Sequence, residues 1–249
     1  MTNSQSLPDK VPFYNLMVNV IGRAELLGAV RQQAISAGQT TINFLNAHCF
    51  NIAQQNEPYK KALNSCTFLL NDGVGVDIAG KFAGVRFEEN LNGTDLIPEI
   101  LDVLASANQS VFLFGAKPDV IAKAAKSIAS THPNLTIAGF CDGYATDPQE
   151  VVDQIRSSSA DAVILGLGVP LQELWVEQHA DEVKCAKVFV CGGAIFDFIS
   201  GNVRRAPEAI RRIKLEWLYR LIQEPKRLFS RYVLGSFQFL YYLVTRRRK

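Results

Sequence analysis

The first candidate for chemistry in this sequence is the pair Asp72-Gly73, which directly follows the apolar run FLLN. A carboxylate at the end of a strand can act as a general base if an acceptor hydroxyl lies within hydrogen-bond reach. Asp-Gly pairs also form simple turns, because both residue types suit turn geometry. The pair therefore indicates either a catalytic base or a turn, and Asp72 is the foremost candidate for the base.

Two glycine-containing segments, GLGVPLQE and CGGAIFDF, follow later apolar runs. In the first, backbone N–H groups around Gly168 could bind a diphosphate at the start of a helix, with Gln172 as a further donor. In the second, which contains Gly193, Asp197 could accept a hydrogen bond from a base or ribose, or could simply be a first-turn helix residue. Glycines after strands also allow close helix packing, and the GxG in the first segment lacks the spacing of a dinucleotide-binding fingerprint or a Walker loop.

Metal-binding patterns are missing from the sequence. The three histidines have neither HxH nor HExxH spacing, the five cysteines are scattered without a CxxC pair, and there is no DxD-type acidic pair. We therefore expect no metal and no cofactor, so that arginines must offset the charge of any bound phosphate. The scattered cysteines and an N-terminus without a signal-peptide pattern predict a cytoplasmic location.

The candidates above need a scaffold that brings strand ends together. Short runs such as VFLFG and AVILGLG are continuously apolar, as parallel strands covered on both faces require. Helical segments alternate with these runs, which predicts a Rossmann-like, mostly parallel α/β sheet flanked by helices. Its ligand crevice is expected outside the carboxyl ends of the strands. The predicted strands are Thr41–Leu45, Phe68–Leu70, Val111–Phe114, Leu135–Phe140, Ala162–Leu165 and Val188–Val190.

The C-terminal part differs in charge. Residues 203–249 carry 13 Lys and Arg against 3 Asp and Glu, whereas residues 1–202 carry 13 against 21. We therefore expect a catalytic domain over residues 1–202 and a basic, amphipathic, helical appendage over residues 203–249, interrupted at Pro225.

This appendage predicts an anionic partner. Its apolar run Tyr232–Val244 is shorter than the about 20 residues of a membrane span, which favours a helix lying on a membrane surface. A solvated basic helix and a nucleic-acid arm are the alternatives. The aromatic residues follow helical spacing, which fits lipid better than base stacking, so we expect no nucleic-acid partner.

The succession NDGVGV, NGTDL, VFLFGAKP, CDGY, GLGVPLQELW, GGAIFDFISG, RRAPE and LEWLYRLIQEPKR resembles the WecG/TagA/CpsF family of bacterial glycosyltransferases. The resemblance implies a Rossmann-like fold and an inverting, metal-independent transfer from a UDP-sugar to a polyprenyl-diphosphate-linked saccharide, in surface polysaccharide synthesis. It implies a peripheral place on the inner face of the cytoplasmic membrane. Glucose and an N-acetylmannosamine-type sugar are both candidate donors, with a slight preference for glucose, and a homo-oligomer is one option.

The resemblance also assigns roles to residues. It implies catalytic roles for Asp72 as the base, Asn46 and Gln172. Arginines of the appendage are implied to reach over the site. The implied substrate-binding residues are Gly73, Asn92, Gly93, Asp95, Gly115, Gly168, Gly193, Asp197, Arg220, Arg227 and Arg231.

Two positions depart from the family pattern, since Phe44 and Asn90 stand where a threonine and an arginine are expected. These departures predict a different sugar pocket. A membrane-docked nucleotide-sugar-binding regulator or scaffold without turnover remains the alternative function.

Overall fold

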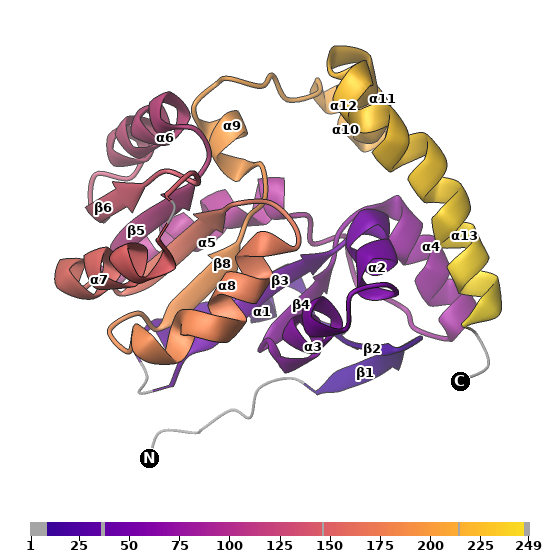
Figure 1. Cartoon of the computed structure of the whole chain (residues 1–249), viewed down its shortest axis with the longest axis horizontal. Coiled ribbons are helices and arrows are strands. Elements are labelled where there is room, and N and C mark those ends of the chain that lie inside the picture. Colours follow the sequence, from indigo (N-terminus) through magenta and orange to yellow (C-terminus); the bar gives the residue numbers. More distant parts are fainter. Residues whose placement is uncertain (1–8, 36–37, 146, 214, 247–249) are drawn as a thin grey trace.

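The computed structural model describes residues 9–35, 38–145, 147–213 and 215–246. Its centre is a six-stranded, entirely parallel sheet in the order β4-β3-β8-β7-β5-β6 (Figure 1). Each of the six predicted strands is present, which confirms the predicted fold class. The strands are β3 (Thr40–Leu45), β4 (Phe68–Asn71), β5 (Ser110–Gly115), β6 (Thr136–Cys141), β7 (Ala162–Gly166) and β8 (Val188–Cys191).

Helices cover both faces of this sheet. Alternate strand residues pack against α1, α5, α6 and α9 on one face and against α2, α3, α7 and α8 on the other. Burial on both faces explains why the strand sequences show no alternation of polar and apolar residues. The helices are α1 (Arg23–Ala34), α2 (Ala47–Ala53), α3 (Glu57–Ser65), α4 (Val74–Ala83), α5 (Gly93–Ser106), α6 (Pro118–Thr131), α7 (Pro148–Ser158), α8 (Leu171–His179) and α9 (Ile195–Ile199), with a 3₁₀ turn, η1 (Ala180–Glu182), after α8.

An antiparallel hairpin that was not predicted from the sequence is formed by β1 (Lys10–Phe13) and β2 (Leu16–Asn19). This hairpin lies beside β4, at one edge of the main sheet. The Oδ1 atom of Asn19 accepts a hydrogen bond from the backbone N–H of Leu69 at 2.8 Å. The hairpin therefore covers an edge strand whose backbone groups would otherwise be open to other chains.

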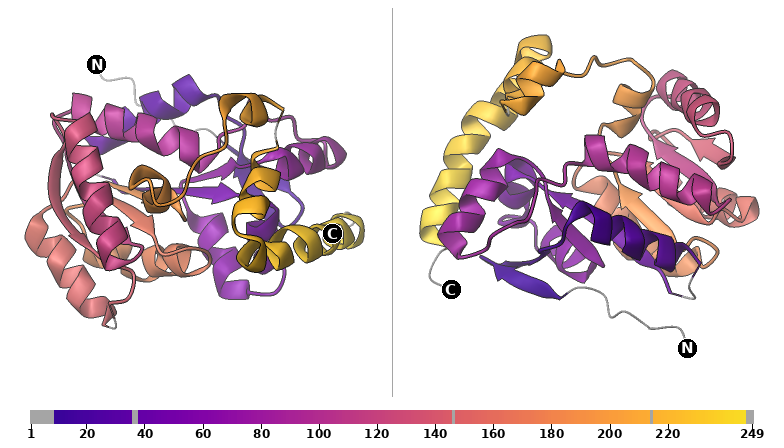
Figure 2. Two further views of the ribbon diagram at one scale, coloured as in Figure 1. Left: turned by 90° about the horizontal axis from the view of Figure 1, so that it is seen from above. Right: turned by 180° about the vertical axis from the view of Figure 1, so that it is seen from behind.

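The C-terminal segment forms a chain of helices that lies against the α/β core (Figure 2). Pro225 starts a new helix, as predicted, because proline suits a first helical turn better than a helix interior. None of the helices in the described ranges has both the length and the apolarity needed to cross a membrane. The helices are α10 (Glu208–Arg212), α11 (Glu216–Gln223), α12 (Pro225–Phe229), the π-helical turn η2 (Ser230–Leu234) and α13 (Gly235–Thr245).

Helix α13 docks on α2 through an aromatic contact and a hydrogen bond. The rings of Phe239 and Phe50 lie 5.3 Å apart, edge to face, and Phe239 is 5% exposed. The Nδ2 atom of Asn51 donates to the backbone oxygen of Gly235 at 2.7 Å. The appendage is therefore packed on the core, and the boundary at residues 202/203 stays a prediction from charge.

Candidate active site

A cavity of about 1030 Å³ lies where β3, β4, β7 and β8 end, with the C-terminal helices along its other side. This is the edge of the sheet at which parallel α/β folds bind ligands. Most of the predicted site residues meet here, although they come from six separate parts of the chain. Those that line the cavity are Asn46, Asp72, Gly93, Gly168, Gln172, Gly193, Asp197, Arg220 and Arg231.

The pairing of β3 with β4 brings Asn46 and Asp72 together. Leu45 and Asn71 are register partners at the ends of the two strands, so the next residues leave the sheet side by side. The backbone N–H of Asp72 donates to the oxygen of Leu45 at 2.8 Å, which continues the ladder by one bond. The two predicted catalytic residues are therefore neighbours because of strand register.

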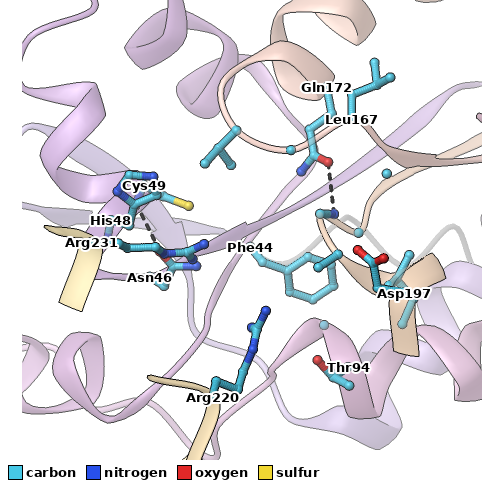
Figure 3. Close-up of a pocket in the computed structure, with 18 of the residues that line it drawn as sticks. Phe44, Asn46, His48, Cys49, Thr94, Leu167, Gln172, Asp197, Arg220 and Arg231 are labelled. Atoms are coloured by element: carbon cyan, nitrogen blue, oxygen red, sulfur yellow. Dashed lines mark hydrogen bonds between the residues drawn. The ribbon is translucent and has the colours of Figure 1, made fainter. Parts of the chain in front are cut away.

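Asn46 is the N-cap of α2, and this fixes the orientation of its amide. Its Oδ1 atom accepts hydrogen bonds from the backbone N–H groups of His48 and Cys49, both at 3.0 Å (Figure 3). The NH₂ group must then point the other way, where it hydrogen-bonds the carboxyl of Asp72. A helix cap thus supplies a donor to the candidate base.

The carboxyl of Asp72 is suited to accept a proton near neutral pH. Burial raises its pKa to about 6, and the charge of Glu216 adds to this rise. The hydrogen bond from Asn46 and the charges of Arg231 and Arg220 oppose it. The residue stays partly open to the cavity, so a substrate hydroxyl can reach it.

The loop after Asp72 is held by two asparagines. Gly73 has a φ of 96°, which favours glycine, and its backbone N–H donates to Oδ1 of Asn90 at 3.0 Å. The Nδ2 atom of the buried Asn71 donates to Oδ1 of Asp77 at 2.7 Å and to the oxygen of Glu89 at 2.9 Å. The chain therefore bends at Gly73 between β4 and α4, and Asp72 next to it carries a cavity-lining carboxylate. Asn90 supports the loop and is not among the residues that line the cavity.

Gln172 joins α8 to the glycine loop after β8. Its Oε1 atom accepts from the backbone N–H of Gly193 at 2.9 Å, and its Nε2 atom donates to Oε1 of Glu173 at 2.8 Å. Both side chains are 2% exposed. Burial raises the pKa of Glu173 to about 7. Gln172 therefore fixes the position of a cavity-lining loop, and Glu173 fixes the orientation of Gln172.

Two roles were predicted for Asp197, a first-turn helix residue and a substrate-binding residue. It lies in the first turn of α9 and also lines the cavity. Its Oδ1 atom accepts from Nδ2 of Asn202 at 3.0 Å, and its backbone oxygen accepts from the N–H of Val203 at 3.0 Å. The carboxylate thereby holds the start of the connection to the appendage.

Two arginines of the appendage point into the cavity (Figure 3). The guanidinium carbon of Arg220 lies 5.0 Å from the ring centre of Phe198, and that of Arg231 lies 5.8 Å from the ring of Tyr232. The Nε atoms of both arginines are buried and meet no acceptor within the described part of the chain. Buried cationic donors of this kind favour a bound anion. The side chain of Arg227 lies outside what the structure describes.

Four predicted substrate-binding residues are not among the cavity-lining residues: Gly73, Asn92, Asp95 and Gly115. Asn92 caps α5, with its Oδ1 accepting from the N–H of Asp95 at 3.0 Å. Asp95 pairs with Arg205 at 2.5 Å and with Arg211 at 3.5 Å, so it ties the start of the appendage to the core. Gly115 has a φ of 136°, and a Cβ atom there would lie 2.4 Å from the carbonyl carbon of Gly166.

Other cavity residues were not predicted as site residues. The imidazole of His48 has its pKa lowered to about 4, first by burial and then by the charge of Arg231, so it is neutral at physiological pH. Phe44, 6% exposed, places its ring against Gly93. Thr94 and Tyr144 also line the cavity. In the sequence Phe44 stood out only as a departure from the family pattern, and no spacing distinguishes His48, Thr94 or Tyr144. Within the described ranges no group of three or more His, Cys, Asp or Glu could hold a metal ion.

A parallel α/β sheet with a carboxylate, glycine loops and arginine Nε donors at its carboxyl edge is a site suited to an anionic ligand. The model of the glycosyl transferase WecG/TagA/CpsF family matches residues 11–249. The chain belongs to this family and is a glycosyltransferase.

Curated relatives agree with this assignment. The N-acetylglucosaminyldiphosphoundecaprenol N-acetyl-beta-D-mannosaminyltransferase of Bacillus spizizenii is 38% identical over 175 residues, which are 70% of this chain and 68% of the relative. The protein of the same name from Bacillus subtilis is 37% identical over 192 residues, 76% of this chain and 75% of the relative. That of Staphylococcus aureus strain MW2 is 27% identical over 196 residues, 77% of each chain.

Proposed function

We propose that this protein transfers a sugar from a UDP-sugar to a polyprenyl-diphosphate-linked saccharide, with inversion at the anomeric carbon and without a metal ion. The observation that carries the proposal is one cavity with two chemically opposite sides. A carboxyl with a pKa of about 6 lies at one strand end, and two arginines of the appendage with buried Nε atoms line the same cavity. A single displacement needs these two sides, a base for the nucleophile and cations for the leaving group.

In this proposal Asp72 acts on the acceptor. Its carboxylate accepts the proton of an acceptor hydroxyl as that oxygen forms a bond to the anomeric carbon of the donor. Asn46, whose NH₂ group hydrogen-bonds Asp72, keeps the carboxylate in place and favours its ionised form. One attack from the side opposite the leaving group inverts the anomeric centre.

The leaving group is UDP. As the bond from the anomeric carbon to the β-phosphate oxygen breaks, that oxygen gains the electron pair and its negative charge. Arg220 and Arg231 are placed to stabilise this charge, because both line the cavity and have free Nε donors within the described residues. Backbone N–H groups of the loops at Gly168 and Gly193 are the proposed contacts for the remaining phosphate oxygens.

The names of the relatives favour particular substrates. They describe transfer of N-acetyl-beta-D-mannosamine to N-acetylglucosaminyl diphosphoundecaprenol. We therefore place an N-acetylmannosamine-type donor first and glucose second, and we propose a polyprenyl-diphosphate-linked acceptor in the synthesis of a surface polysaccharide. Such an acceptor lies in a membrane, which fits a peripheral enzyme on the inner face of the cytoplasmic membrane.

A donor and acceptor screen tests this function. Purified protein is mixed with UDP-N-acetylmannosamine, its uronate or UDP-glucose, with and without an N-acetylglucosaminyl-diphosphate-lipid acceptor, and free UDP is measured. The expected result is UDP release from one donor only when the acceptor is present, unchanged by a chelator. UDP-sugar binding without turnover on any lipid acceptor would instead indicate a regulator or scaffold.

A further inference from the structure

Helix α13 is apolar on two opposite sides. One side carries Phe239 and the partly buried Tyr242 and Leu243, which pack on α2 and the core. At about 100° per residue, a second set of apolar residues lies on the opposite side. This outer side is exposed: Phe237 is 70%, Leu240 59%, Tyr241 63% and Val244 77% accessible.

Helix α4 of the α/β core carries a second exposed apolar strip next to α13. Gly75, Ile78 and Phe82 follow one another at spacings of three and four residues, so they share one strip of the helix. Gly75 is in contact distance of Phe239, since a Cβ atom at Gly75 would lie 3.7 Å from that ring. The strip therefore runs alongside α13, as the ribbons also show (Figures 1 and 2). Ile78 is 48% and Phe82 59% exposed.

Basic residues lie beside both exposed apolar strips. Lys81 and Arg86 are exposed on and just after α4, and Arg246 follows α13. The sequence from Pro225 to its end contains no Asp or Glu. The acid on α4, Asp77, accepts a hydrogen bond from the buried Asn71 at 2.7 Å and so faces the core. Two exposed acids, Glu88 and Glu89, follow Arg86, and Glu89 pairs with Arg23 at 3.2 Å. Apolar side chains with cations beside them match an anionic lipid leaflet.

We propose that α4 and the outer side of α13 together form one docking surface for an anionic lipid bilayer. This rests on the proposed function in one respect, that the acceptor lies in a membrane. It adds that the catalytic core touches the bilayer directly through Ile78, Lys81 and Phe82. Because α4 begins immediately after Gly73, this contact holds the base-bearing loop at the membrane surface, where a lipid-linked hydroxyl can reach Asp72.

Vesicle co-sedimentation of the full-length protein tests the docking surface. The variant Ile78→Ser/Phe82→Ser is compared with wild type on vesicles of phosphatidylglycerol and phosphatidylcholine and on phosphatidylcholine alone. Removing two inserted apolar side chains should weaken binding to the anionic vesicles at least about tenfold. The control Phe140→Ser changes a residue with 47% exposure on β6, at the other edge of the sheet, and should bind as wild type does.

Melting temperature, turnover and oligomeric state distinguish a loss of membrane docking from a loss of folding or of dimerisation. The melting temperature and turnover of a soluble acceptor analogue should be unchanged in Ile78→Ser/Phe82→Ser, and only turnover of a vesicle-borne acceptor should fall. Wild-type vesicle binding by this variant, while Phe237→Ser/Leu240→Ser loses it, would overturn the role of α4. So would a dimer of the wild type that the variant converts to a monomer without any change in vesicle binding. Vesicle binding without any turnover by the wild type contradicts the proposed function and leaves the docking surface intact.

Discussion

Asn46 donates a hydrogen bond to Asp72 because the other end of its amide is already engaged. Its Oδ1 atom caps α2 by accepting the N–H groups of His48 and Cys49 at 3.0 Å. An amide with a fixed acceptor end has a fixed donor end. The residue that caps α2, directly after β3, therefore favours the ionised form of the carboxyl that follows β4.

Asn46→Ala tests this relationship. The pKa of Asp72 should rise, because the substitution removes a hydrogen bond that favours the carboxylate. The acidic limb of the pH profile of kcat/KM should therefore move to higher pH. Asn56→Ala is the matched control, since Asn56 caps α3 by accepting from the N–H of Tyr59 at 3.0 Å. Both variants should lose about 1 kcal/mol of stability, but only Asn46→Ala should move the limb.

The wild-type pH profile follows from the state of Asp72. A base must be ionised, and burial raises this pKa to about 6, so kcat/KM should be constant above that pH and fall about tenfold per pH unit below it. Glu216→Gln should move the limb to lower pH, because Glu216 raises the pKa. Arg231→Gln should move it to higher pH. Limbs that moved in the same direction in both variants would contradict electrostatic control of this carboxyl.

Glu173 is predicted to act through Gln172. Glu173→Leu removes the acceptor for Nε2 of Gln172, so that the amide can turn and release the N–H of Gly193. UDP affinity should fall about tenfold, by the loss of a buried hydrogen bond. Glu173→Gln keeps an acceptor oxygen and should stay near wild type. In the double variant with Gln172→Leu, the losses should not add, which distinguishes this positioning role from a general loss of packing.

The appendage arginines should bind the donor diphosphate. Arg220→Gln should weaken UDP binding by roughly 10- to 100-fold, as expected for the loss of a charged hydrogen-bond partner in a partly buried site. Isothermal titration with UDP measures this directly. Arg212→Gln is the control, because Arg212 is exposed and pairs with Glu208 at 2.6 Å outside the cavity. Equal UDP affinity in the wild type, Arg220→Gln and Arg212→Gln would contradict this role and indicate that the loops of the core bind the diphosphate.

The strands and the ligand edge of the sheet were predictable from the sequence. Continuous apolar runs such as AVILG are buried on both faces, and a small or polar residue ends each of them. The hairpin β1–β2 was not predictable in this way, since its two strands have four residues each and one of them contains Pro12. Its position depends on long-range contacts such as that of Asn19 with Leu69.

The site was predictable as a set of residues but not as a set of contacts. Sequence order places Asn46 and Asp72 far apart, and only the register of Leu45 with Asn71 makes them neighbours. For the same reason nothing in the sequence showed that Asp95 holds the appendage. That role depends on ion pairs with arginines more than 100 residues further along the chain.

We propose that Asp72 is the base of the sugar transfer and that other groups hold the donor. Asp72→Asn keeps the size of the side chain and one acceptor oxygen, but the amide cannot accept the proton. Turnover and UDP binding should be measured on the same preparation, with the donor and acceptor identified in the screen. We expect kcat to fall about 10²- to 10⁴-fold while UDP affinity stays nearly unchanged. Wild-type turnover by Asp72→Asn would contradict it.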